Sequence, residues 1–163
     1  MDQDYLDTMK YSFDLAEQAV RPGGELFWFA CDSKDQIAVF STAGFGLVPR
    51  ETLCRRTDFL NAFSYFAFEA TENAGEVVVV GRMPDEPDDQ LSEWLEFGRK
   101  GLFAFDCPSK MTGRYGQLVR PKEVLILSQI PVDIQAYLQR HRLRDVDFAD
   151  VVHVDACAHF ECV

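Results

Sequence analysis

Residues 25–41 carry the pattern that most limits the fold: two apolar runs on either side of a short polar segment. Residues 25–31 are apolar after Glu25 and rich in aromatic side chains, which is typical of a buried strand. Residues 36–41 alternate between two faces, as a strand does. The intervening Asp32-Ser33-Lys34-Asp35 has residues that favour turns. The segment therefore predicts a β-hairpin.

The rest of the chain predicts a mixture of helices and short strands. Apolar residues at helical spacing predict helices over residues 4–20, 50–72, 88–100 and 130–141. Short β-branched or aromatic runs predict strands over residues 77–80, 101–106, 115–119, 124–127 and 148–154. The strands come in hairpin-like groups rather than in strict alternation with helices. This order favours an α+β fold, with a mixed or mainly antiparallel sheet packed by three to four helices.

The chain is of ordinary size for one domain. Its 163 residues, 13% of them aromatic, can form a sizeable core. No linker divides it, so we expect a single domain over residues 1–163. Residues 155–163 are expected to form an acidic tail whose order the sequence leaves open.

Charge and compartment signals limit the class of partner. A net charge of −11 makes the chain a poor ligand for nucleic acid, because phosphates would be repelled. The start of the chain is acidic and lacks the pattern of a secretory signal, and no apolar run approaches the length needed to cross a bilayer. The 5 cysteines are odd in number and widely spread, unlike a disulfide framework. These features predict a cytoplasmic protein.

The segment Thr42-Ala43-Gly44-Phe45-Gly46 is the main candidate for a small-ligand site. Backbone amides at a turn that leads into a helix can bind an anion. The segment lacks the Gly-Lys-Ser/Thr ending of a phosphate loop and the spacing of a dinucleotide fingerprint. A strand-to-helix turn that needs glycine is therefore the favoured interpretation. A ligand-binding domain or enzyme that uses Gly44–Gly46 is the alternative function.

No catalytic constellation stands out elsewhere. The 3 histidines all lie in the last quarter of the chain, and a Gly-x-Ser-x-Gly elbow is missing from the sequence. Cys157, His159 and Cys162 are the first candidates for a metal, but without a paired Cys-x-x-Cys we expect none there. The sequence thus predicts neither an enzyme nor a cofactor.

Acidic residues are concentrated in two blocks. Residues 83–97 hold six acids and residues 145–163 hold five, and neither block contains lysine or arginine. Such blocks form either a solvated face or a surface that docks a basic partner. Under the second interpretation, the candidate contact residues are Asp85, Glu86, Asp88, Asp89, Glu93, Trp94, Glu96, Asp145, Asp147 and Asp150. Trp94 is the candidate anchor, although packing in the core is the favoured role for a tryptophan.

Two stretches resemble a known group of proteins. The first comprises Leu26-Phe27-Trp28-Phe29-Ala30, Asp32, residues 37–46 and Val48-Pro49. The second comprises residues 101–106, Arg114-Tyr115, Pro121, Ile130-Pro131 and Phe148. Together, over about residues 25–150, they resemble small cytosolic immunity proteins encoded beside bacterial polymorphic toxins, including contact-dependent and type VI effectors.

The resemblance implies a non-enzymatic inhibitor that binds a cognate toxin stoichiometrically and blocks its active site or substrate entry. It transfers no catalytic or contact residues, because toxin-contacting positions vary within such families. An acidic surface suits a toxin with a basic cleft, because it can mimic phosphate charge. We therefore expect a bacterial immunity protein whose partner is a toxin or effector domain, and neither nucleic acid nor a membrane.

Overall fold

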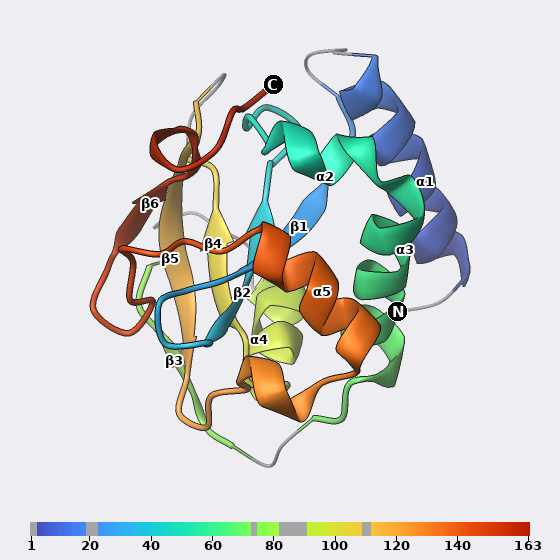
Figure 1. The fold of residues 1–163 in the computed structure, drawn as a ribbon. Helices are drawn as coiled ribbons and strands as arrows, with labels where there is room; N and C mark the ends of the chain where they lie inside the picture. Colours follow the sequence, from blue (N-terminus) through green and yellow to red (C-terminus); the bar gives the residue numbers. More distant parts are fainter. Residues whose placement is uncertain (1–2, 19–22, 73–74, 82–90, 109–111) are drawn as a thin grey trace.

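The computed structural model describes residues 3–18, 23–72, 75–81, 91–108 and 112–163. Within them, five α-helices pack around a six-stranded sheet (Figure 1). The helices are α1 (Gln3–Glu17), α2 (Arg50–Cys54), α3 (Arg56–Ser64), α4 (Leu91–Arg99) and α5 (Val132–Arg140). The strands are β1 (Phe27–Cys31), β2 (Ile37–Ser41), β3 (Val77–Val79), β4 (Phe103–Asp106), β5 (Arg114–Pro121) and β6 (His153–Asp155). The α+β class predicted from the sequence is confirmed.

Shorter helical turns complete these elements. A π-helical turn, η1 (Tyr65–Glu69), continues α3, and 3₁₀ turns form η2 (Leu127–Gln129) and η3 (Ala156–Ala158). None of the helices in the described part of the chain combines the length and apolar character that crossing a membrane requires.

The sheet is mixed, with the strand order β1-β2-β4-β5-β3. β1 and β2 form the predicted hairpin, with Phe27 opposite Ser41. β2 and β4 are parallel, with Ser41 opposite Asp106. The remaining pairs are antiparallel, and β6 and β3 follow one another along the same side of β5 (Figure 1).

Helices cover one face of the sheet. Phe27 and Phe29 of β1 are fully buried on this face. The ring of Phe27 lies 5.5 Å from Trp94 of α4 and 6.5 Å from Phe63 of α3. Phe29 lies 4.7 Å from Phe66 of η1. The aromatic residues of the hairpin thus form the contact through which the helices pack on the sheet.

The C-terminal segment covers the other face. Trp28 stacks on Phe40 at 4.3 Å, and Phe40 stacks on Phe105 at 4.9 Å, across three neighbouring strands. Phe148 and Phe160 add edge contacts to this cluster. Since these two residues belong to irregular chain after α5, loop side chains close this face of the core.

Three of the predicted elements differ in the structure. The helix predicted over 50–72 is interrupted at Arg55, whose φ of −134° and ψ of 67° are not helical. Residues 124–127 form no strand, because the only sheet contact of this segment is a single bridge between Ile126 and Gln36. The N–H of Ile126 donates to the side-chain oxygen of Gln129 instead, and the turn η2 begins here. The last strand is the short β6 rather than residues 148–154.

Residues 155–163 are held against the start of α2. Val48 and Val163 exchange both backbone hydrogen bonds, at 3.0 and 2.9 Å. The N–H of Arg50 donates to the Glu161 carbonyl at 2.7 Å. The acidic tail is thus part of the fold.

His141 is a buried imidazole at the end of α5. Its Nδ1 lies 3.0 Å from the Tyr137 carbonyl, which can only accept, so Nδ1 carries the proton. Its Nε2 lies 3.1 Å from Thr52 Oγ1 of α2 and therefore accepts from that hydroxyl. Burial lowers the pKa of His141 to about 4, because the charged form would lose its hydration, and the nearby Arg140 guanidinium adds to this effect.

His141 should make the fold less stable in mild acid. Its pKa is about 4 in the folded state against 6.5 in an unfolded chain. Between these values the unfolded state binds a proton that the folded state does not, so stability falls as pH drops through this window, by up to about 3 kcal/mol. Urea unfolding from pH 7.5 to 4.5 measures this. His141→Gln should remove this part of the pH dependence of the free energy of unfolding. The control His153→Gln, at an exposed position, should keep it. The same pH dependence in the parent and both variants would show that His141 is not its source.

Candidate functional site

A cleft of about 370 Å³ opens where the carboxyl ends of β2 and β4 meet the first turn of α4. Because β2 and β4 are parallel and in register, Ser41 and Asp106 end at the same edge of the sheet. A short connection joins α4 to β4, so Glu93 and Trp94 at the start of α4 also reach this edge. Glu25 reaches it as well, since it lies two residues before β1, which is antiparallel to β2.

We call this site the acidic cleft; it is lined by Gly23, Glu25, Ala43, Gly44, Glu93, Trp94 and Asp106. Its three carboxyl groups come from three separate parts of the chain. Among the described residues that line it there is no lysine, arginine or histidine. Trp94 is 5% exposed and its ring packs on Phe27, so it forms part of the wall. The cleft is therefore an acidic hollow with one aromatic wall.

The acids of the cleft lie near enough to affect one another. Ser41 Oγ donates a hydrogen bond of 2.5 Å to Glu25 Oε1. Desolvation of the Glu25 carboxyl raises its pKa; the Ser41 hydrogen bond opposes this, and the nearby Glu93 carboxylate adds to it. Burial and the Glu93 carboxylate also raise the pKa of the Tyr5 hydroxyl. A cation placed between Glu25 and Glu93 would relieve their repulsion.

The glycine turn beside the cleft is a structural connection. The four amides of residues 43–46 are hydrogen bonded within the turn, to side-chain oxygens of Ser41 and Thr42 or to the Thr42 carbonyl, at 2.7–3.3 Å. Gly44 has a φ of +75°, and a Cβ there would lie 2.8 Å from the Gly23 carbonyl oxygen. Glycine is thus required by the backbone. Since the amides are occupied and carboxylates lie beside them, the turn is poorly suited to bind an anion.

The two C-terminal cysteines, Cys157 and Cys162, lie near each other. Burial and a hydrogen bond to Cys157 raise the pKa of Cys162. Across the described residues, no three histidine, cysteine or acidic side chains are arranged to hold a metal ion. This finding includes Cys157, His159 and Cys162, and also the acids of the cleft.

The structure separates the predicted contact residues into three groups. Glu93 and Trp94 line the acidic cleft, whereas Glu96 binds the buried Lys100 at 2.8 Å. Asp145, Asp147 and Asp150 lie in the segment after α5, where Asp145 and Asp150 are exposed. Asp85, Glu86, Asp88 and Asp89 lie outside the described residues.

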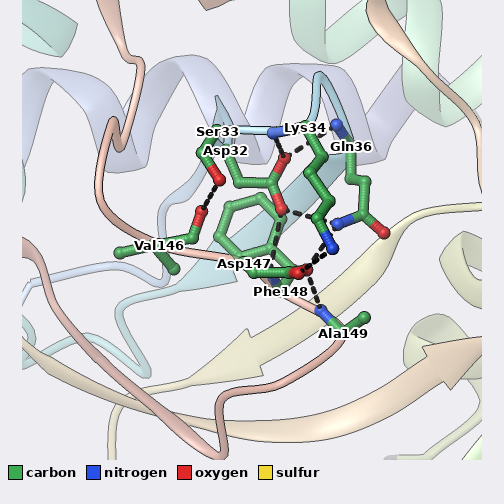
Figure 2. Close-up of polar contacts among 8 residues, drawn as sticks. All are labelled: Asp32, Ser33, Lys34, Gln36, Val146, Asp147, Phe148 and Ala149. Atoms are coloured by element: carbon green, nitrogen blue, oxygen red, sulfur yellow. Dashed lines mark hydrogen bonds and ion pairs between the residues drawn. The ribbon is translucent and has the colours of Figure 1, made fainter.

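Asp147 belongs to a hydrogen-bonded network centred on Asp32, in the turn between β1 and β2. Asp32 is fully buried, and its carboxylate accepts four hydrogen bonds, from Lys34 N, Gln36 N, Gln36 Nε2 and Phe148 N, at 2.8–2.9 Å. Figure 2 shows these donors around the carboxyl group. Asp147 accepts from Gln36 Nε2 at 2.7 Å and pairs with Lys34 at 2.5 Å, a hydrogen bond that lowers the pKa of Asp147. Asp147 thus attaches the C-terminal segment to the hairpin, and its charge is partly neutralised.

Sequence reasoning missed two residues of the cleft, Glu25 and Asp106. Glu25 lies two residues before β1, and Asp106 is the last residue of β4. Both are outside the two acidic blocks, so charge clustering did not select them. The signal that would have found them is the parallel pairing of β2 with β4, which the pattern of either strand alone does not reveal.

No protein-family model matches this chain, and neither a curated protein nor a solved structure matches it. The acidic cleft is therefore interpreted from its own geometry and charge.

Asp32 should be a major source of stability. Asp32→Ala would remove the acceptor of four N–H groups, three of them in buried hydrogen bonds, and should lower the free energy of unfolding by about 3 kcal/mol. Chemical denaturation at pH 7 measures the change. The control Asp145→Ala, at an exposed position, should stay within about 0.5 kcal/mol of the parent. Similar losses in the two variants would show that the network does not have this role.

Proposed function

We propose that the chain is an immunity protein, a non-enzymatic inhibitor that binds a cognate bacterial toxin in a stoichiometric complex. The acidic cleft is its central contact, and it receives a basic side chain of the toxin. The observation that carries the proposal is the convergence of Glu25, Glu93 and Asp106 on one hollow, with no basic side chain among the described residues that line it.

The charges of the chain support a basic partner. The net charge of −11 produces a negative field around the whole molecule, which speeds encounter with a basic surface. Glu25 and Glu93 have no ion pair with any described residue. The groups that lie against them are the hydroxyls of Ser41 and Tyr5, which do not neutralise their charge. A guanidinium group could hydrogen bond to both carboxylates at once, and such charge-assisted bonds are among the strongest.

Trp94 supports the same kind of contact. Trp94 lines the cleft, and its ring is held against Phe27. A guanidinium that enters the cleft can lie against this ring, and cation–π contacts are stronger where water is excluded. A buried, rigid anchor surrounded by carboxylates is a typical centre for a tight interface.

A small cationic molecule is the second candidate for the cleft. It is favoured by the position of the cleft at the carboxyl ends of two parallel strands, where ligands often bind. Under this alternative, a primary amine or guanidine compound should raise the melting temperature of the isolated protein. The inhibitor hypothesis requires no such shift at micromolar concentrations.

The partner can be identified by affinity capture of the tagged protein from its host, followed by mass spectrometry. A single stoichiometric partner with a basic domain, released at high salt, is the expected result, because salt screens exposed charges. The purified partner then allows association rates and affinities to be measured.

The double variant Glu25→Gln with Glu93→Gln should weaken toxin binding at least about tenfold, since it removes two carboxylates that face the cation. Surface plasmon resonance at two salt concentrations measures both the affinity and its salt dependence, which should decrease. The matched control, Asp145→Asn with Asp150→Asn, removes the same charge outside the cleft and should change the affinity less than about threefold. An equal loss of affinity in both double variants would show that only the net charge matters, and would exclude the cleft as the contact.

A further inference from the structure

The outer edge of β3 offers backbone hydrogen-bonding groups to another strand. β3 is the last strand in the order β1-β2-β4-β5-β3, and no strand of the described chain pairs with its outer side. Lys122 N–H donates to the Glu76 carbonyl and Val80 N–H to the Leu118 carbonyl, so the even-numbered residues bond to β5. In an antiparallel pair, the residues between them direct their backbone N–H and C=O groups away from the paired strand. Val77 and Val79 therefore present N–H and C=O groups to the free edge.

The side chains along this edge are apolar and exposed. Val78, Val79 and Val80 are consecutive, and each is 40–43% exposed. Natural edge strands are commonly protected from pairing by lysine, proline or a bulge. Residues 77–80 contain no lysine or proline, and β3 pairs with β5 in continuous register. Among the described residues, nothing therefore blocks the addition of a strand to this edge.

A groove runs between this edge and α4. It has a volume of about 570 Å³ and is lined by residues 75–79, Leu95, Arg99 and Lys122. α4 approaches β3 closely because Gly98 has no side chain; a Cβ there would lie 2.7 Å from Val77 Cγ1. A strand added beside β3 would place alternate side chains in this groove, against Leu95 and the valines.

The groove carries a positive charge at one end. Lys122 is paired with Glu76 across the β3–β5 ladder. Arg99 is exposed at the end of α4, and no residue of the described chain forms an ion pair with it. In a chain of net charge −11, an unpaired arginine beside an apolar groove favours a ligand that carries a carboxylate at that end.

We propose that the β3–α4 groove binds an extended segment of a partner protein, which adds a strand to β3. The segment has apolar residues at alternate positions and an acidic residue that faces Arg99. A second copy of this chain fits less well. Glu76, the acid next to its β3, is already paired with Lys122, and two molecules of charge −11 repel one another. The site is separate from the acidic cleft, because Glu93 lies in the first turn of α4 and Arg99 at its end.

The test uses a phage-displayed library of random twelve-residue peptides, selected on the immobilised full chain. Enriched peptides are expected to alternate apolar residues and to contain Asp or Glu. On the variant Arg99→Glu, the same selection should enrich Lys or Arg in place of the acid. If peptides selected on Arg99→Glu lose the acidic residue but gain no basic residue in its place, Arg99 does not contact the acidic side chain of the ligand.

Strand addition is tested separately with Val79→Pro. Proline lacks the N–H that Val79 directs outward, while the ladder to β5 uses neighbouring residues, so the fold should be retained and circular dichroism and thermal melting can confirm it. A synthetic peptide chosen on the parent should bind this variant at least about tenfold more weakly. The matched control is Val132→Pro, an exposed valine at the first position of α5 where proline is tolerated, and binding should be unchanged.

Other outcomes would overturn the proposal. These are the absence of any enriched peptide, or binding that Val79→Pro does not affect. A dimer in sedimentation velocity that Val79→Pro dissociates would assign the edge to a second copy instead. The double variant Glu25→Gln with Glu93→Gln should bind the peptide as the parent does, so failure at the acidic cleft and failure at this groove can be distinguished.

Discussion

The parallel pairing of β2 with β4 connects the hydrophobic core to the acidic cleft. It stacks Phe40 on Phe105 inside the sheet and places Ser41 beside Asp106 where both strands end. Adjacent parallel strands need a long crossover connection, and here that connection includes α2, α3 and α4. Because α4 leads directly into β4, its first turn comes to the edge where β2 ends. The cleft is thus a consequence of how the sheet is connected.

The acidic residues of this chain have different roles, which their number alone does not reveal. Asp32 and Asp147 hold the C-terminal segment against the hairpin, and Glu96 neutralises the buried Lys100. Their charges are used within the fold. Glu25 and Glu93 instead lie in an open cleft without a basic neighbour among the described residues. We therefore propose that a basic partner is recognised by these two acids, which form no ion pair with a described residue.

The helix α4 contributes residues to both surfaces for which we propose partners. Its start contributes Glu93 and Trp94 to the acidic cleft, and its end contributes Arg99 to the groove beside β3. The two surfaces have opposite charge, and they use different chemistry, side-chain ion pairs at the cleft and backbone pairing at the groove. The variants of the two sites distinguish a single partner that contacts both surfaces from separate partners for each surface.

Local patterns in the sequence were enough to predict the α+β class, the hairpin of β1 and β2, and the helix α5. Apolar periodicity and turn residues act over a few neighbouring positions, so each of these elements could be predicted by itself. The interruption of the helix at Arg55 and the single bridge made by Ile126 depend on contacts with distant segments, and periodicity does not include them. The same limit applies to the site. Clustering of charge selected Glu93 and Trp94, but Glu25 and Asp106 join them only through the parallel pairing of β2 and β4. Which carboxylates stay unpaired also depends on long-range neighbours, because an ion pair forms between groups that are close in space rather than in sequence.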